Sequence, residues 1–251
     1  MDFLIFLPVG LVEHPILSLV SFLGGVIPAC IWLCFWLFED RCQPEPKRFI
    51  FYAFVAGMIA IGPTLVLQAI AQQYLPPYSL GLIGMWALTE EIMIFLAAYV
   101  AALRLYVFDE PIDAIIYMVT AALGFSALEN ALFLWPQIVN GDLLRIVALG
   151  ESRFLGATLV HTLSSSTVGI ALAISFNKPA SMRKLYAICG IILSTILHTT
   201  YNYFIVNIPE GAGAHSTQGA EETFWIFVCV WCGIIATLLV IERLKTPKDY
   251  C

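Results

Sequence analysis

Apolar residues gather in seven stretches of the chain, each about as long as a bilayer requires of a helix. A spanning α-helix needs about 20 mostly apolar residues. The seven stretches are residues 15–38, 49–70, 80–104, 112–136, 153–176, 184–208 and 223–242. Because only helices and closed barrels satisfy backbone polar groups within lipid, the pattern predicts an all-α, polytopic membrane helix bundle.

The segments around these stretches add no second domain. Turn-forming pairs such as Pro76-Pro77 and Asn140-Gly141 mark short connections. The segment Phe3–Val12 is apolar but too short to span, so we expect it at an interface or against the bundle, with an eighth span as the alternative. We therefore interpret residues 1–251 as a single membrane domain.

Lysine and arginine are distributed unevenly along the chain. If the seven stretches span, ten of the twelve Lys and Arg residues fall on one side of the membrane. Cytoplasmic loops carry the excess of these residues. The pattern predicts that the N-terminus lies outside and the C-terminus in the cytoplasm, and an error of one span would scramble the bias.

The composition excludes several classes of protein. Hydrophobic residues make up 60% of the chain and charged residues 12%, against about 45–50% and about 25% in soluble domains. The net charge of -6 provides no basic surface for nucleic acid. The chain is therefore not a water-soluble enzyme, a disordered chain or a nucleic-acid-binding protein, and a lipid bilayer surrounds most of it.

Four predicted spans carry ionisable side chains. The third holds Glu90 and Glu91, the fourth Glu129, the fifth His161 and the sixth His198. Charged groups of this kind cost at least ~2.5–3.5 kcal/mol in a membrane helix, so they face the bundle interior and are functional by default. These groups belong to polar stripes at helical spacing. Ser126 and Asn130 share a stripe with Glu129; Thr158, Ser164 and Ser165 share one with His161; and Thr195, Thr199 and Asn202 share one with His198.

These groups also agree in depth. With a rise of ~1.5 Å per residue, Glu90, Glu129, His161 and His198 each lie about 10–15 Å below the outer end of their span. That level is between the outer surface and the midplane of a hydrocarbon core about 30 Å thick. Independent structural residues would have no reason to share it, so we expect the four groups to form one site.

The residue types favour metal-assisted hydrolysis. Two histidines and a carboxylate form the ligand set of a catalytic zinc with an open position. Without an HExxH helix, separate helices supply Glu129, His161 and His198 as ligands, and Glu90 or Glu91 is available as general base. Glu90 and Glu91 are about 100° apart around their helix, so we expect one to face the site and the other a neighbouring helix.

The same residues permit other chemistry. At the metal site, Asn202, one turn beyond His198, can donate to the tetrahedral oxyanion. Without a metal, a Glu–His pair can activate water directly while the second His binds the oxyanion. A proton-coupled transporter uses such residues too, as does a non-catalytic scaffold. Against transport, no pair of Gly/Pro-broken helices recurs in two halves. We interpret the serine run 164–166 as helix packing.

At these residues the chain resembles the PrsW-type intramembrane metalloproteases. The family's pattern is Glu-Glu in one span, FxxxEN in the next, and a His in each of two later spans, the second followed by Asn. The matching residues are Glu90-Glu91; Phe125, Glu129 and Asn130; Arg153 with His161; and His198 with Asn202, and the segment that begins near Asp113 is also typical. The resemblance runs from about Leu80 to Phe204, which we interpret as the catalytic core.

One position departs from the family pattern. The family commonly shows EExxK, and Ile94 stands at the last place here. The distantly similar CAAX-protease and bacteriocin-immunity group, with EExxxR and FxxxH, fits less well, because Phe95 stands in place of its Arg and Glu129 in place of its His.

The resemblance implies proteolysis within or near the membrane, with Zn²⁺ as cofactor if a metal is bound. It further implies a bacterial cytoplasmic membrane as location and a single-span membrane protein as substrate, for example an anti-sigma factor cleaved at site 1. Phe125, Asn130, Arg153 and Asp113 are implied to support the site. The depth of the polar groups is consistent with this implied cleavage. A site reached from outside would cut a single-span substrate near the outer face of the membrane.

Overall fold

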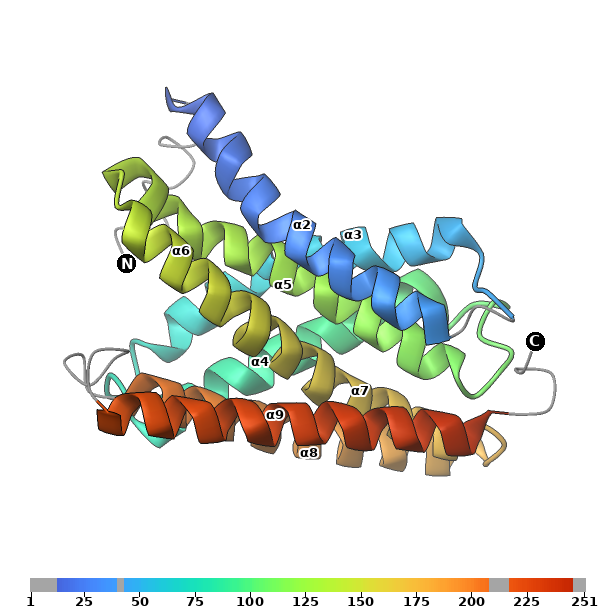
Figure 1. The fold of residues 1–251 in the computed structure, drawn as a ribbon. Coiled ribbons are helices and arrows are strands. Elements are labelled where there is room, and N and C mark those ends of the chain that lie inside the picture. The colour runs from blue at the N-terminus through green and yellow to red at the C-terminus, as the bar shows by residue number, and fades with distance from the viewer. Residues whose placement is uncertain (1–12, 40–42, 208–216, 246–251) are drawn as a thin grey trace.

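The computed structural model describes residues 13–39, 43–207 and 217–245, and regular structure in these ranges is helical throughout (Figure 1). The helices are α2 (Pro15–Glu39), α3 (Lys47–Ala71), α4 (Leu80–Ala98), α5 (Asp113–Asn140), α6 (Leu143–Ser152), α7 (Thr158–Ile174), α8 (Ala180–Asn207) and α9 (Thr217–Leu244). Two π-helical turns, η1 (Tyr99–Leu103) and η2 (Arg153–Ala157), continue α4 and join α6 to α7. The predicted all-α bundle is confirmed.

Within the described ranges, seven helices are long and apolar enough to cross a membrane, and they match the seven predicted spans. The segment Phe3–Val12, with its alternative of an eighth span, lies outside the described residues. The fifth span differs from the prediction, because it begins at Leu143 rather than at residue 153. Asp142 caps α6 by accepting a hydrogen bond from the Arg145 N–H (3.1 Å), and η2 carries the helix on into α7.

Helix α5 is the centre of the bundle. Most of its residues are buried, and α2, α3, α4 and α7 pack along it, while α8 and α9 lie against α7 (Figure 1). Small residues permit this close packing. A Cβ at Gly57 of α3 would collide with the carbonyl of Ala121, and one at Gly124 of α5 would collide with the carbonyl of Phe54. The backbones of α3 and α5 therefore touch near the middle of the bundle.

Turn chemistry fixes the helix ends that flank the polar groups. Gly141 ends α5 with a positive φ of 68°, as expected for the predicted Asn140-Gly141 turn. Ser79 caps α4 by accepting a hydrogen bond from the Leu82 N–H (3.2 Å). Helices α4, α5, α7 and α8 pack against one another and enclose the polar residues. Which end faces the cytoplasm stays a prediction of the Lys and Arg pattern.

Candidate active site

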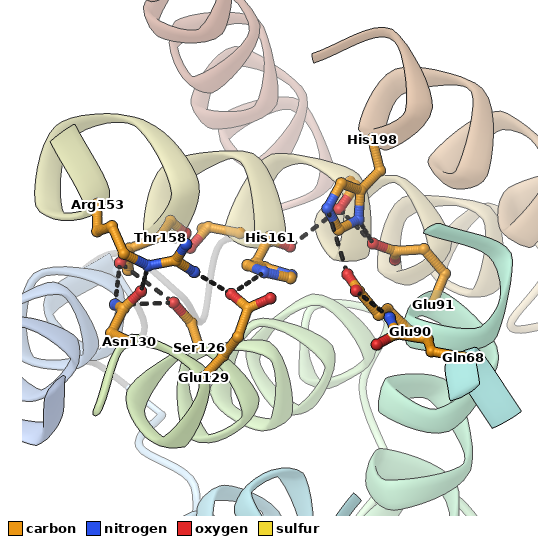
Figure 2. Close-up of polar contacts among 12 residues, drawn as sticks. Gln68, Glu90, Glu91, Ser126, Glu129, Asn130, Arg153, Thr158, His161 and His198 are labelled. Atoms are coloured by element: carbon orange, nitrogen blue, oxygen red, sulfur yellow. Dashed lines mark hydrogen bonds and ion pairs between the residues drawn. The ribbon is translucent and has the colours of Figure 1, made fainter. Parts of the chain in front are cut away.

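Four helices bring the predicted ionisable residues into contact (Figure 2). Glu90 and Glu91 come from α4, Glu129 from α5, His161 from α7 and His198 from α8. All but Glu129 are buried. In Figure 2, His161 lies between a group formed by Arg153, Glu129 and Asn130 and a group formed by His198, Glu90 and Glu91. The shared depth expected from the sequence therefore corresponds to a single cluster.

The ring of His198 lies between the two adjacent glutamates. Its Nδ1 is 2.8 Å from Oε1 of Glu91, and its Nε2 is 3.4 Å from Oε2 of Glu90. We expected one of these carboxylates to face the site and the other a neighbouring helix. Of the two, Glu90 belongs to the group of possible metal ligands, and Glu91 bonds to serines of α7 and α8, although both reach the ring of His198. An imidazole presents two separate nitrogens, so carboxylates about 100° apart around α4 both reach the same ring.

Glu91 is held by hydroxyl groups from two other helices. Ser164 and Ser165 of α7 donate to its two carboxylate oxygens at 2.7 and 3.3 Å. Ser194 of α8 also donates to it. Ser164 and Ser165 thus do more than pack helices, contrary to our interpretation of the serine run. Sequence reasoning missed Ser194, although its place four residues before His198 puts it on the same helix face.

One carboxylate oxygen of Glu90 has a hydrogen bond, and the other has only the longer contact with His198. Oε1 of Glu90 accepts a hydrogen bond from Nε2 of Gln68 on α3 (2.6 Å). Its Oε2 is buried and has no hydrogen-bond partner. Gln68 was also missed by sequence reasoning, although it interrupts the apolar stretch 49–70 close to its end. Glu90 is therefore fixed on one side and open on the other.

On the other side of His161, Arg153 pairs with the Glu-Asn motif of α5. Its guanidinium forms an ion pair with Glu129 and donates a hydrogen bond to Oδ1 of Asn130. The Nδ2 of Asn130 donates to Oγ1 of Thr158 (2.9 Å). Oε2 of Glu129 lies 3.1 Å from Nε2 of His161. Arg153 is the first residue of η2, and a π-helical turn of this kind often marks a functional site.

Aromatic contacts fix the histidine rings. The rings of His161 and His198 meet edge to face, with centroids 4.7 Å apart and planes at 84°. Phe125, fully buried on α5, packs its ring 5.4 Å from that of His161. The Phe of the FxxxEN motif therefore supports one histidine directly.

Two predicted residues lie outside this contact network. Asp113 begins α5, sixteen residues before Glu129 and about 24 Å away along the helix. Asn202 lies one turn after His198 on α8 and is half-buried. Among the described residues, no hydrogen bond joins Asn202 to the cluster. The oxyanion role of Asn202 stays a prediction.

The cluster contains a group suited to a divalent metal ion. Glu90, His161 and His198 each offer one ligand atom, and these atoms lie within 4.8 Å of one another. Two of the available atoms, Oε2 of Glu90 and Nδ1 of His161, are buried without a hydrogen-bond partner, which is costly unless something else pairs with them. The 3.4 Å between Glu90 and His198 matches the separation of about 3.4 Å expected for two ligands of a tetrahedral zinc. The residues present therefore fit a metal.

Comparisons with known proteins identify the family of this chain. A family described as "PrsW family intramembrane metalloprotease" matches residues 45–240, a wider region than the segment that carried the resemblance. The chain is 25% identical to "Protease PrsW" of Geobacillus kaustophilus over 194 residues, covering 75% of this chain and 80% of that protein. It is 21% identical to "Protease PrsW" of Bacillus subtilis over 193 residues, covering 74% and 83%.

No solved structure matches the chain. The family match nevertheless includes all four helices that supply the cluster. The described part of the chain contains seven helices long and apolar enough to cross a membrane, so the protein is an integral membrane protein. On these grounds the chain belongs to the PrsW family of intramembrane metalloproteases and is a protease.

Proposed function

We propose that this protein hydrolyses a peptide bond of a membrane-anchored substrate at the Glu and His cluster, with a divalent metal ion held by Glu90, His161 and His198. The observation that supports this most is the pair of buried, unpaired atoms on Glu90 and His161 within a compact ligand group. The nitrogen and carboxylate donors suit Zn²⁺. When bound, the metal would polarise the scissile carbonyl and activate water.

This proposal exchanges two roles that we assigned from the sequence. Glu90 takes the third ligand position, because it groups with both histidines. Glu129 takes the role of general base, because its side chain is 17% exposed, against 8% for Glu90 and 0% for Glu91. A base must reach the attacking water, and we assign this role to Glu129 as the least buried of the three carboxylates.

In the proposed reaction, the attacking water forms a bond to the carbonyl carbon and gives one proton to Glu129. The carbon–nitrogen bond then breaks, and Glu129 returns the proton to the leaving amine nitrogen. Arg153 orients Glu129 through their ion pair. In this proposal Asn202, one turn after His198 on α8, donates a hydrogen bond to the oxyanion.

The proposed substrate is a single-span membrane protein of the bacterial cytoplasmic membrane, with an anti-sigma factor as the example that the family resemblance suggests. Glu90 lies ten residues into α4, about 15 Å from the helix start at Leu80. With the predicted orientation, a site at this depth would cut near the outer face of the membrane. A reporter fused after Cys251 should then report a cytoplasmic location.

The test is cleavage of a co-expressed single-span substrate. Glu90→Gln and His198→Ala should abolish the cleaved fragment while the protein remains inserted. Glu242→Gln is the matched control, because Glu242 lies in the last turn of α9 and pairs with Lys245. Ion-driven or pH-driven flux that is lost in the same variants, with no fragment in the wild type, would instead establish a transporter.

A further inference from the structure

Glu91 is the most completely bonded carboxylate of the cluster. Ser164 and the Nδ1 of His198 both meet its Oε1, at 2.7 and 2.8 Å. Ser165 and Ser194 both donate to its Oε2. Glu91 and the three serines are fully buried. This network ties α4, α7 and α8 together at one point.

The network determines which nitrogen of His198 carries the proton. A carboxylate only accepts hydrogen bonds, whereas each ring nitrogen of a neutral imidazole is either a donor or an acceptor. Because three hydroxyl groups already donate to Glu91, Nδ1 of His198 completes the set as a fourth donor. The lone pair is then on Nε2, which faces Oε2 of Glu90.

We infer that Ser164, Ser165 and Ser194 are positioning residues, which hold Glu91 so that it orients His198 with Nε2 toward the metal group. The inference rests on the proposed function, in which His198 is a ligand. Carboxylates that receive the second N–H of a metal-binding histidine fix its tautomer and ring orientation, and their loss typically costs 10–100-fold in metal affinity or activity. Here the serines extend that support by one further layer of hydrogen bonds.

Ser166, the residue after Ser165 on α7, makes contacts typical of helix packing. Ser166 donates to the carbonyl of Leu163 in its own helix (2.7 Å) and lies 3.3 Å from Oγ1 of Thr237 on α9. It is as buried as Ser164 and Ser165 but does not touch Glu91. Ser166→Ala is therefore a matched control, since it removes the same hydroxyl group from an adjacent position of the same helix.

The experiment compares Ser164→Ala, Ser194→Ala and their double variant with Ser166→Ala in the full-length, detergent-purified chain. The first readout is Zn²⁺ affinity, measured by competition with a chelator. We expect the double variant to bind Zn²⁺ about 10–100-fold more weakly and Ser166→Ala to bind as the wild type does. If the double variant does not fold, Ser165→Ala removes the longest of the bonds and is the milder replacement.

The second readout is the tautomer of His198, read from ¹⁵N-histidine resonances of metal-free protein. The chain has four histidines, and the His198→Ala spectrum assigns the signal. We expect a protonated Nδ1 in the wild type and in Ser166→Ala, and mixed tautomers in the double variant. Unchanged affinity and tautomer in the double variant would overturn the inference while the proposed function stands. If His198→Ala itself retains Zn²⁺ binding and cleavage, the proposed function is wrong as well.

Discussion

Helix α5 carries one carboxylate at its start, Asp113, and another past its middle, Glu129, and the two have different kinds of partner. At the start of the helix, Oδ2 of Asp113 accepts hydrogen bonds from the backbone N–H groups of Asp109 (3.0 Å) and Glu110 (2.7 Å). Those two residues belong to the connection between α4 and α5. Asp113 therefore pairs with the backbone of a local turn and holds it against the helix, and its carboxyl group also shares a hydrogen bond with the side chain of Glu45.

Toward the other end, Glu129 contacts only side chains from distant parts of the sequence, Arg153 and His161. Close to it, Oε2 of Glu90 and Nδ1 of His161 are buried and have no hydrogen-bond partner. The difference teaches that burial of a carboxylate does not by itself indicate function here. The candidate active site differs from the turn at Asp113 because it brings together, from separate helices, buried polar atoms that have no hydrogen bond.

The largest expected effect is the loss of a ligand. Glu90→Gln and His161→Ala should each reduce cleavage of a membrane substrate below detection, because the metal group would be incomplete. Residues that act as a unit are strongly non-additive, so the double variant should be no worse than either single variant. Fragment yield in membranes measures this, and fragment from either single variant that the double variant no longer produces would separate the two residues functionally.

The next effect is the loss of the proposed base. Glu129→Gln should lower the cleavage rate by about 10²–10⁴-fold and leave the metal content unchanged, whereas Glu90→Gln should lose the metal. Metal content and cleavage rate of the same purified samples measure this pair. The opposite result, with metal lost only in Glu129→Gln, would restore the assignment made from the sequence.

A smaller effect is expected at Arg153. Its guanidinium contacts Glu129 and Asn130 at once and lies 4.0 Å above the ring of Phe133. A lysine cannot reproduce this planar, forked geometry. Arg153→Lys should therefore lower the cleavage rate by about 10–100-fold with metal retained, by analogy with other supporting partners of metal sites. A wild-type rate in this variant would show that the ion pair is dispensable.

The smallest effect on chemistry is expected at Asp113. Asp113→Ala leaves the backbone N–H groups of Asp109 and Glu110 without their acceptor, and each lost hydrogen bond costs about 0.5–1.5 kcal/mol of folding free energy. Cleavage per folded molecule should nevertheless be unchanged. Thermal unfolding in detergent measures the first effect, and the rate normalised to folded protein measures the second. A specific loss of rate without loss of stability would place Asp113 in the active machinery.

Much of this picture follows from the sequence for physical reasons. A span must be apolar, so its polar exceptions are visible, and helical rise alone places Glu90, Glu129, His161 and His198 at one depth. The match between expectation and structure is therefore best for the spans and for the set of residues that meet.

The details of pairing could not be read in the same way. Depth and face do not specify how far each helix rotates or which rotamer a side chain adopts. For this reason, the contacts of Glu91 with His198 and Ser194 were not predicted, nor was that of Gln68 with Glu90. The fifth span starts before residue 153 because α6 precedes it and η2 continues the helix from Arg153 into α7.

The metal content of the purified chain tests the central claim most directly. Mass spectrometry of the wild type, His161→Ala, His198→Ala and Asp113→Ala should show about one divalent ion per chain in the wild type and in Asp113→Ala, and none in the two histidine variants. That result would show that the metal binds at the buried Glu and His group and that the buried Asp113 is not needed for binding. A wild type without metal, or histidine variants that retain it, would contradict the account and favour water activated by the Glu–His pairs alone.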